Sequence, residues 1–309
     1  GYSRPVVLDS NGAWEAVLEN AYDIIVTGEI NGEDTLSFKI PYRDSKRSYI
    51  DSEKKIQIVD DFYKVRTVTD TKDTEGNAIT EVYAEAEFYD LTFSVRKEER
   101  SFEAETAEVP MTYALAGTEW AVGTVNVRTK RTWTSSEKNA LSILRNVADL
   151  HGGDLVFDCA NRLVHLLTVN GKDSGALFAY RKNMKSIQRV VDTRGLVTRL
   201  YAFGADGLTF ADINNGKPYV EDYTYTNEVR ISTLDCSSFT NPNQMKEYAE
   251  MRLAQYAKPT ISYVLNAMDL SVLTGYEHEA WALGDYVRVE DKELGISVTT
   301  RIVRREYNL

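Results

Sequence analysis

Alternation of polar and apolar positions is the main pattern in the first third of the chain. Residues 35–40 alternate strictly, and the Asn31-Gly32 pair before them is a strong signal for a hairpin turn. The same pattern recurs, between turn residues, in further short runs at 22–27, 55–59, 62–68 and 79–86. Short antiparallel strands at this spacing are typical of a small closed barrel or a curled sheet. We therefore expect a first β-barrel-like domain over residues 1–100.

Helical spacing enters in the middle of the chain. Ser136 is a natural N-cap for a helix that buries one apolar stripe and ends at Gly152-Gly153. Thr106 is expected to cap a shorter helix that runs to Leu115. Strand pairs are predicted before and after the longer helix, 120–122 with 129–133 and 154–158 with 163–167. These elements predict an α/β module over residues 101–190.

Strands predominate again in the last third, at 197–204, at 262–267 and in a closing hairpin of 286–290 with 298–303. One helix interrupts them, with Asn241 as its cap and Pro242 as its first residue. Residues 191–309 are thus expected to form a second β-barrel-like domain with one inserted helix. Because 56–68 and 286–303 share a strand, acidic turn and strand, the two barrels are predicted to be similar. The expected fold class is α+β, mostly β, with two small β-barrel-like domains and an α/β module between them.

Charge argues against nucleic-acid recognition. The 309 residues carry 47 acidic and 36 basic side chains, for a net charge of −11, which repels a phosphate backbone. Two basic clusters alternate along predicted strands, and we interpret them as solvated or subunit-facing strand edges: Arg128, Lys130 and Arg131, and Arg301, Arg304 and Arg305. The sequence has neither an apolar run of the roughly 20 residues a membrane span needs nor a signal peptide at its start.

Candidate chemistry is sparse. The histidines are His151 at the end of a helix, His165 inside a strand and His278 in a loop, and a structural role is favoured for each. Cys159 and Cys236 are expected to be buried thiols. Because the HExxH, paired-cysteine, GxSxG and P-loop patterns do not occur, we predict no catalytic, cofactor-binding or metal-ligating residues and no cofactor. Two alternatives stay open: a carboxylate pair of a glycosidase, which only spatial separation can identify, and sugar stacking by Trp120, Trp133 and Trp281, for which core packing is the simpler interpretation.

Several sequence segments together resemble the prophage endopeptidase tail family, the tail-associated minor structural proteins of phages that infect Gram-positive bacteria. The longest is DTRGLVTRLYAFGADGLT at 192–209, and the others in chain order are INGE at 30–33, YDL at 89–91, GGDLVFD at 152–158, NGKPYVED at 215–222, LGDYV at 283–287 and RIV at 301–303. The resemblance extends over essentially the whole chain. It supplies no catalytic motif that can be transferred residue by residue.

The resemblance implies a structural baseplate hub at the virion tail tip rather than an enzyme. Such proteins form a homotrimer whose two barrels per chain make a ring of six similar modules, which closes the tail tube until infection. Partners would be the distal tail protein, the tube and tape measure proteins and a downstream fibre or lysin, with a role in host cell attachment. DNA would pass the channel without specific binding, and an acidic lumen would help it slide. Alternatives are a peptidoglycan-degrading tail-associated endopeptidase and a cell-surface carbohydrate-binding module.

Overall fold

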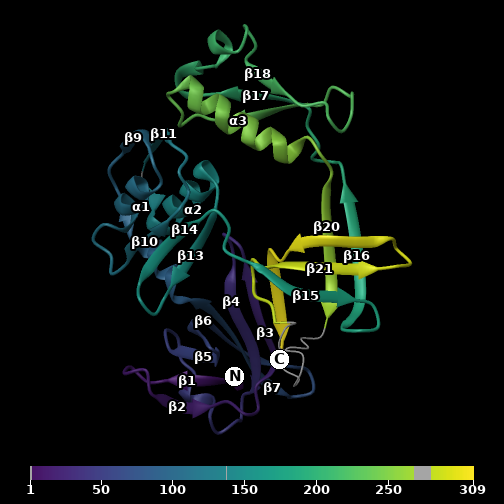
Figure 1. Ribbon diagram of the computed structural model, residues 1–309. Helices are drawn as coiled ribbons and strands as arrows, with labels where there is room; N and C mark the ends of the chain where they lie inside the picture. The colour runs from purple at the N-terminus through teal and green to yellow at the C-terminus, as the bar shows by residue number, and fades with distance from the viewer. Residues whose placement is uncertain (1, 137, 268–279) are drawn as a thin grey trace.

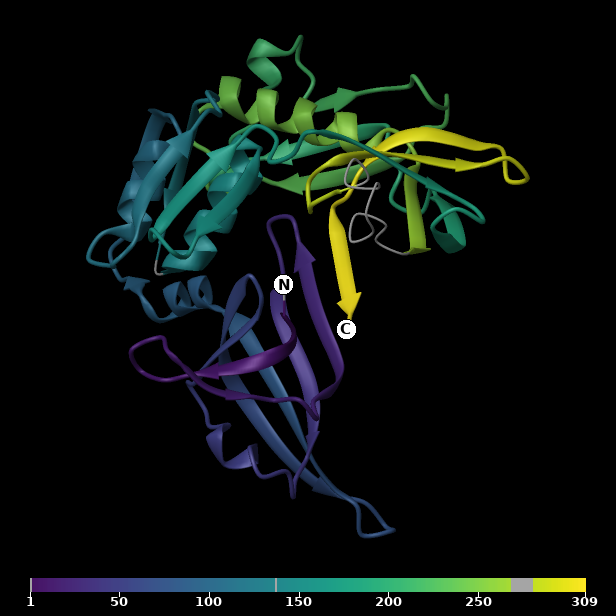
Figure 2. The same ribbon diagram turned by 60° about the horizontal axis from the view of Figure 1, so that its bottom comes forward.

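The computed structural model describes residues 2–136, 138–267 and 280–309. Strands predominate in it, and a curled sheet and a smaller β unit are joined by an α/β module (Figure 1). The expected fold class is therefore confirmed. A second small α/β unit, which contains the one helix predicted in the last third, packs at the opposite end from the curled sheet (Figures 1 and 2).

Eight strands of the described chain form the curled sheet, in the order β2-β1-β5-β6-β7-β4-β3-β23. Every neighbouring pair is antiparallel. Alternation explains its inner face: on β4, Leu36, Phe38 and Ile40 are at most 1% exposed, whereas Ser37 and Lys39 between them are half-buried. The strands are β1 Tyr2–Leu8, β2 Trp14–Val17, β3 Tyr22–Glu29, β4 Asp34–Pro41, β5 Lys55–Val59, β6 Asp61–Lys72, β7 Ala78–Ala86 and β23 Arg304–Asn308.

The last strand of the chain belongs to this first sheet. β23 pairs with β3 from Arg304 opposite Glu29 to Asn308 opposite Ile25, and Figure 2 shows it reaching away from the smaller β unit toward the curled sheet. The chain therefore ends in the unit in which it began. Nothing in the sequence pattern indicated this pairing.

In the sequence, the α/β module follows β7 of the curled sheet and precedes the smaller β unit. Its three-stranded sheet has the order β10-β14-β13, and α1 packs against α2 beside it. The elements are β9 Arg100–Glu105, α1 Glu108–Leu115, β10 Ala121–Val125, β11 Arg131–Ser135, α2 Ala140–His151, β13 Asp154–Asp158 and β14 Leu163–Leu167, with the short pair β8 Val95–Arg96 and β12 Lys138–Asn139. The 3₁₀ helices of the described residues lie elsewhere in the chain. Two follow strands of the curled sheet, η1 Arg47–Tyr49 after β4 and η2 Glu87–Phe93 after β7, and two belong to the second α/β unit, η3 Ala205–Gly207 and η4 Ala211–Ile213.

One predicted strand pair of this module is wrong. β13 and β14 do pair as expected, but β10 runs parallel to β14 while β11 pairs with β9. The reason lies in Asn126 after β10. Its N–H donates to Leu166 O at 3.1 Å, and its side-chain oxygen accepts from Thr168 N at 2.6 Å. These bonds keep the chain along β14, so it does not turn back on β10.

Both predicted helix starts in the module need correction. Asn139, not Ser136, caps α2, because its Oδ1 accepts from Ser142 N at 2.8 Å. An earlier start is prevented by β12, whose pairing with β8 keeps residues 138–139 extended. Helix α1 begins at Glu108, with no side-chain cap, rather than directly after Thr106. The predicted end of α2 is confirmed, since Gly152 adopts φ +85°.

The smaller β unit has its own core. β15, β21 and β22 form one sheet, β16 and β20 form a two-stranded ribbon, and the apolar side chains between them are separate from the main core. The predicted closing hairpin is confirmed as β21 and β22. The strands are β15 Asp173–Ala179, β16 Met184–Asp192, β20 Thr260–Ala267, β21 Tyr286–Asp291 and β22 Ile296–Arg301.

The second α/β unit is inserted between the two strands of that ribbon. The chain leaves the smaller β unit along β16 and returns along β20 (Figure 1). Helix α3 covers one face of a small sheet with the order β18-β17-β19. Its predicted cap is confirmed, because Asn241 Oδ1 accepts from Gln244 N at 3.1 Å. The elements are β17 Arg199–Phe203, β18 Tyr219–Glu221, β19 Ile231–Asp235 and α3 Pro242–Tyr256.

Candidate functional site

His151 is a structural residue at the end of α2. The side chain is 2% exposed, and its Nδ1 lies 3.0 Å from Thr129 O. Its Nε2 is buried without a partner in the described part of the chain. The pKa of His151 is lowered from 6.5 to about 4, chiefly by burial and to a smaller extent by the positive charge of Arg131. The imidazole is therefore neutral at physiological pH and closed off from any substrate.

The second histidine and both cysteines also serve the fold. His165 Nδ1 accepts from Thr124 N at 2.7 Å and so ties β14 to β10. Burial raises the pKa of Cys159 to about 11 and that of Cys236 to about 12. The charged groups near these thiols are carboxylates and arginines rather than histidines, so neither thiol is activated as a nucleophile. His278 lies outside the described residues.

Other classes of site find no support in residues 2–136, 138–267 and 280–309. These ranges contain no group of three histidine, cysteine or carboxylate side chains placed to hold a metal ion. Nor do they contain a helix with the length and apolar character that a membrane crossing requires.

The tryptophans proposed for sugar stacking lie in packed surroundings. Trp120 and Trp133 are 7% and 2% exposed, and both belong to the main core. Trp281 stacks on Tyr307 of β23 and meets Phe178 edge to face. Core packing therefore accounts for all three side chains.

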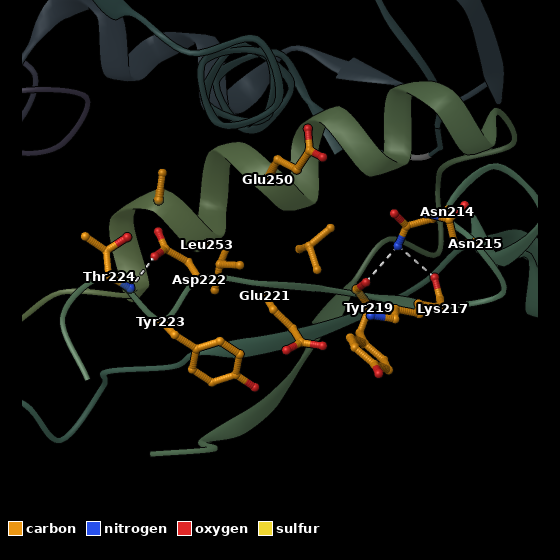
Figure 3. Close-up of a pocket in the computed structure, with 12 residues that line it drawn as sticks. Asn214, Asn215, Lys217, Tyr219, Glu221, Asp222, Tyr223, Thr224, Glu250 and Leu253 are labelled. Carbon is orange, nitrogen blue, oxygen red and sulfur yellow. Dashed lines mark hydrogen bonds between the residues drawn. The ribbon is translucent and has the colours of Figure 1, made fainter. Parts of the chain in front are cut away.

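A groove of about 670 Å³ lies between α3 and the residues that follow β17 (Figure 3). Its carboxylates already have partners. Asp222 accepts from Thr224 N at 2.9 Å, and its hydrogen bonds to Thr224 lower its pKa. Glu250 pairs with Lys246 at 2.9 Å along α3, and Glu221 lies 3.7 Å from Arg199 Nε. A glycosidase of the two-carboxylate kind needs one carboxylic acid with a raised pKa opposite a second carboxylate. Asp222 has the opposite shift.

Four of the seven resemblance segments, 30–33, 152–158, 283–287 and 301–303, come together at one junction. Asn31, in the turn between β3 and β4, reaches the loop before β13 in the α/β module. Its Nδ2 donates to Gly153 O at 2.9 Å, and its Oδ1 accepts from Leu155 N at 2.7 Å. The turn that the sequence predicts at Asn31-Gly32 thus has a second role, because the Asn31 side chain also fastens the curled sheet to the module.

Asp154 sits at the centre of this junction. Its side chain, 7% exposed, forms an ion pair with Arg301 at the end of β22 and accepts from Asn170 N at 2.7 Å. Arg301 Nε also donates to Gly284 O at 2.9 Å. A buried carboxylate of this kind needs paired charge and several hydrogen bonds, and here they come from three separate segments. The α/β module and the smaller β unit are therefore locked together.

Two glycines allow the backbones to meet at the junction. A Cβ on Gly284 would stand 1.8 Å from Asn170 O, and one on Gly171 would stand 1.9 Å from Gly284 O. Gly284 also adopts φ +96°, which side chains strongly disfavour. Only glycine fits at either position.

The basic clusters contribute to the same framework, so their interpretation as solvated edges is only partly right. Arg128 is 69% exposed, as expected of such an edge. Arg131 is 1% exposed, and its Nε donates to Leu150 O, one of the free carbonyls at the end of α2, at 2.7 Å. Arg304 bridges β23 to Glu33 and Glu29 at 3.1 and 3.3 Å.

Comparison with protein families gives a consistent assignment along the chain. Residues 5–86 match the prophage endopeptidase tail N-terminal domain, 94–166 the prophage endopeptidase tail domain, and 172–309 the prophage endopeptidase tail model. The chain belongs to the prophage endopeptidase tail family. This confirms the resemblance read from the sequence and makes the chain a phage tail protein.

Solved structures share the fold at low sequence identity. A prophage tail protein of Listeria monocytogenes superposes with a TM-score of 0.69 at 16% identity, covering 99% of this chain and 90% of its own. The 43 kDa tail protein of Shewanella oneidensis prophage MuSo2 gives 0.69 at 12%, covering 99% and 94%. A type VI secretion component of Escherichia coli gives 0.51 at 9%, covering 99% and 70%. No curated protein matches the sequence.

Proposed function

We propose that this chain is the structural hub of a phage tail tip, acting as a homotrimeric ring rather than as an enzyme. The observation that carries the proposal is the junction around Asp154, which joins both β units and the module between them. A ring subunit must keep its two β units at a constant separation and angle. Ion pairs and backbone hydrogen bonds from several segments provide that constraint.

Two β units in each chain suit a threefold ring. Three copies arranged head to tail present six β units around the axis, so a trimer can stack on a sixfold tube. In this arrangement the ring closes the tube before infection, contacts the distal tail protein and the tube and tape measure proteins, and carries a fibre or lysin below. The net charge of −11 suits a channel through which DNA slides without binding.

The mass in solution tests the oligomer. Light scattering on the purified chain should give a value near three times 35.0 kDa, and electron microscopy should show a ring with a central opening. Mixing the chain with the distal tail protein should give a complex of defined stoichiometry. If the chain forms neither a ring nor this complex, the hub proposal is wrong.

A cell-wall assay separates the hub from the endopeptidase alternative. The family name describes a hydrolase, but the groove carboxylates are engaged and the buried thiols have raised pKa values. We therefore expect no clearing band when this chain is run on a gel that contains peptidoglycan. A clearing band lost on substitution of Asp222 or Glu250 would reverse this assignment.

A further inference from the structure

Two of the resemblance segments that lie outside the junction, 192–209 and 215–222, belong to the second α/β unit and contain β17 and β18. Helix α3 covers the sheet face that carries Leu200, Ala202 and Val220, which are at most 7% exposed. Because side chains alternate along a strand, their neighbours lie on the opposite face. This opposite face, here called the open face, carries Arg199, Tyr201 and Phe203 on β17, Tyr219 and Glu221 on β18, and Ile231, Thr233 and Asp235 on β19.

Aromatic rings form a row across the open face. Tyr201 pairs with Tyr219 on the neighbouring strand, and their ring centroids are 4.9 Å apart. Along β17 the Phe203 ring lies 6.2 Å from the Tyr201 ring, with an angle of 14° between the two planes. The Arg199 guanidinium lies over the Tyr219 ring, 4.6 Å from its centroid. Phe203, at the end of the row, is 45% exposed. Grouped aromatic side chains at a surface are typical of a binding site.

Polar groups border this row of rings. The Glu221 carboxylate lies 3.7 Å from Arg199 Nε, and the side chains of Glu221 and Tyr223 point away from α3 (Figure 3). Thr233 and Asp235 are exposed and lie beside the rings on the β19 side. Hydroxyl groups both donate and accept hydrogen bonds, and carboxylates accept them. The open face therefore combines aromatic rings with hydrogen-bonding groups at its margins.

The charge of this region favours an uncharged ligand. Residues 199–203 and 219–235 contain two arginines and four carboxylates, for a net charge of −2. Such a region repels a phosphate-bearing chain such as DNA or teichoic acid. An apolar protein surface fits poorly as well, because it would bury Glu221 and Asp235 without new hydrogen-bond partners. A saccharide suits both parts of the face, since its C–H groups pack on the negative faces of aromatic rings and its hydroxyls donate to carboxylates.

We propose that the open face of the β18-β17-β19 sheet binds an uncharged polysaccharide of the host cell wall. The rings of Tyr201, Phe203 and Tyr219 pack on the sugar rings, and Glu221 and Asp235 accept hydrogen bonds from sugar hydroxyls. This binding goes beyond the hub function. The choice of the cell wall as the source rests on the tail-tip position proposed above, because a protein at that position meets this surface when the tail reaches the host.

Binding to immobilised saccharides tests the site. The probes are an array of uncharged bacterial cell-wall oligosaccharides, with a single-stranded oligonucleotide and a teichoic acid fragment as charged comparisons. Phe203→Ala removes the exposed ring, and Phe62→Ala on β6 is the matched control, because these strand phenylalanines are 45% and 43% exposed. We expect the native chain and Phe62→Ala to bind the same uncharged saccharide equally, and Phe203→Ala to bind it about tenfold more weakly. Unchanged circular dichroism would establish that both variants are folded.

The carboxylate gives an independent readout on a folded chain. Glu221→Gln keeps the shape of the side chain but replaces a charged acceptor with a weaker neutral one, so affinity for the saccharide should fall about fivefold. Glu81→Gln on β7 is its matched control, because Glu81 is also an exposed strand glutamate. Binding of the native chain should not change as the salt concentration rises, since the ligand carries no charge. Equal affinity of the two glutamine variants would reject the assigned contact.

The outcomes separate this proposal from the hub function. A native chain that binds none of the uncharged saccharides overturns the saccharide site, whereas the hub is decided by the mass in solution and by the distal tail protein mixture. Saccharide binding that Phe203→Ala retains in full would place the ligand elsewhere and reject the open face. Binding of the charged probes alone, weakened by salt, would identify a polyanion site instead. A native trimer that Phe203→Ala reduces to 35.0 kDa would identify the open face as a subunit contact and also overturn the proposal.

Discussion

Acid should destabilise the folded chain through His151. The ring donates from Nδ1 to Thr129 O, as its neutral form allows, and leaves Nε2 buried and unpartnered. A proton on Nε2 would create a buried cation with an unsatisfied N–H, so burial lowers the pKa of His151 from 6.5 to about 4. The unfolded chain therefore binds a proton below pH 6.5 that the folded chain does not bind until about pH 4. Stability is present above this window and is lost as pH falls through it.

The size of the effect follows from the width of that window. Each pKa unit corresponds to about 1.4 kcal/mol, so the whole window is worth about 3 kcal/mol and the step from pH 7 to pH 5 about 2 kcal/mol. His151→Gln removes the titration while keeping an N–H that can reach Thr129 O. In urea unfolding, the difference in free energy of unfolding between the native chain and the variant should be about 2 kcal/mol smaller at pH 5 than at pH 7. Subtracting the two proteins cancels the titration of distant groups. An equal difference at both pH values would refute a neutral, buried His151.

Three other substitutions test the framework. Burial raises the pKa of Asp34 from 3.8 to about 6, so its contribution to stability is complete below pH 3.8 and is lost as the pH rises through 6. Relative to the native chain, the free energy of unfolding of Asp34→Asn in urea titrations should therefore be about 2 kcal/mol higher at pH 8 than at pH 4. Asp154→Ala should cost about 3 kcal/mol in thermal unfolding, because it leaves Arg301 unpaired, whereas Glu290→Ala at the exposed Arg288 pair should cost under about 1 kcal/mol. Asn139→Ala should cost about 1 kcal/mol through loss of the α2 cap, and Ser136→Ala almost nothing; the reverse order would contradict the cap assignment.

Local physics made part of the fold predictable from the sequence. The cap Asn241 and the proline Pro242 act within one helical turn, so the start of α3 could be predicted without knowledge of the tertiary structure. The alternation in β4 likewise identified its buried face. At α2 the prediction of Ser136 was wrong because β12 forms with β8, a segment about forty residues away in the chain. Long-range pairing overrode a locally acceptable cap there.

Strand partners could not be predicted in the same way. Period-two alternation reports which side of a strand is buried but not which strand lies beside it. Arg304 and Arg305 on β23 therefore looked like a solvated edge, although Arg304 pairs with Glu29 and Glu33 at the opposite end of the sequence. Arg131 gave no sign of burial for a similar reason, since its acceptor Leu150 O becomes available only once α2 ends in the right place. Whether an arginine can be buried depends on hydrogen-bond and ion-pair partners that only the folded chain brings to it.

The junction explains why separate short segments can carry a family resemblance without marking an active site. Asn31, Gly153, Asp154, Gly284 and Arg301 lie in four of the quoted segments, yet they meet in one network of hydrogen bonds and an ion pair. In an enzyme such convergence surrounds a cavity that leaves polar groups free for substrate. Here the polar groups bond to one another, and Gly171 and Gly284 bring backbone against backbone. These contacts thus hold the curled sheet, the α/β module and the smaller β unit together.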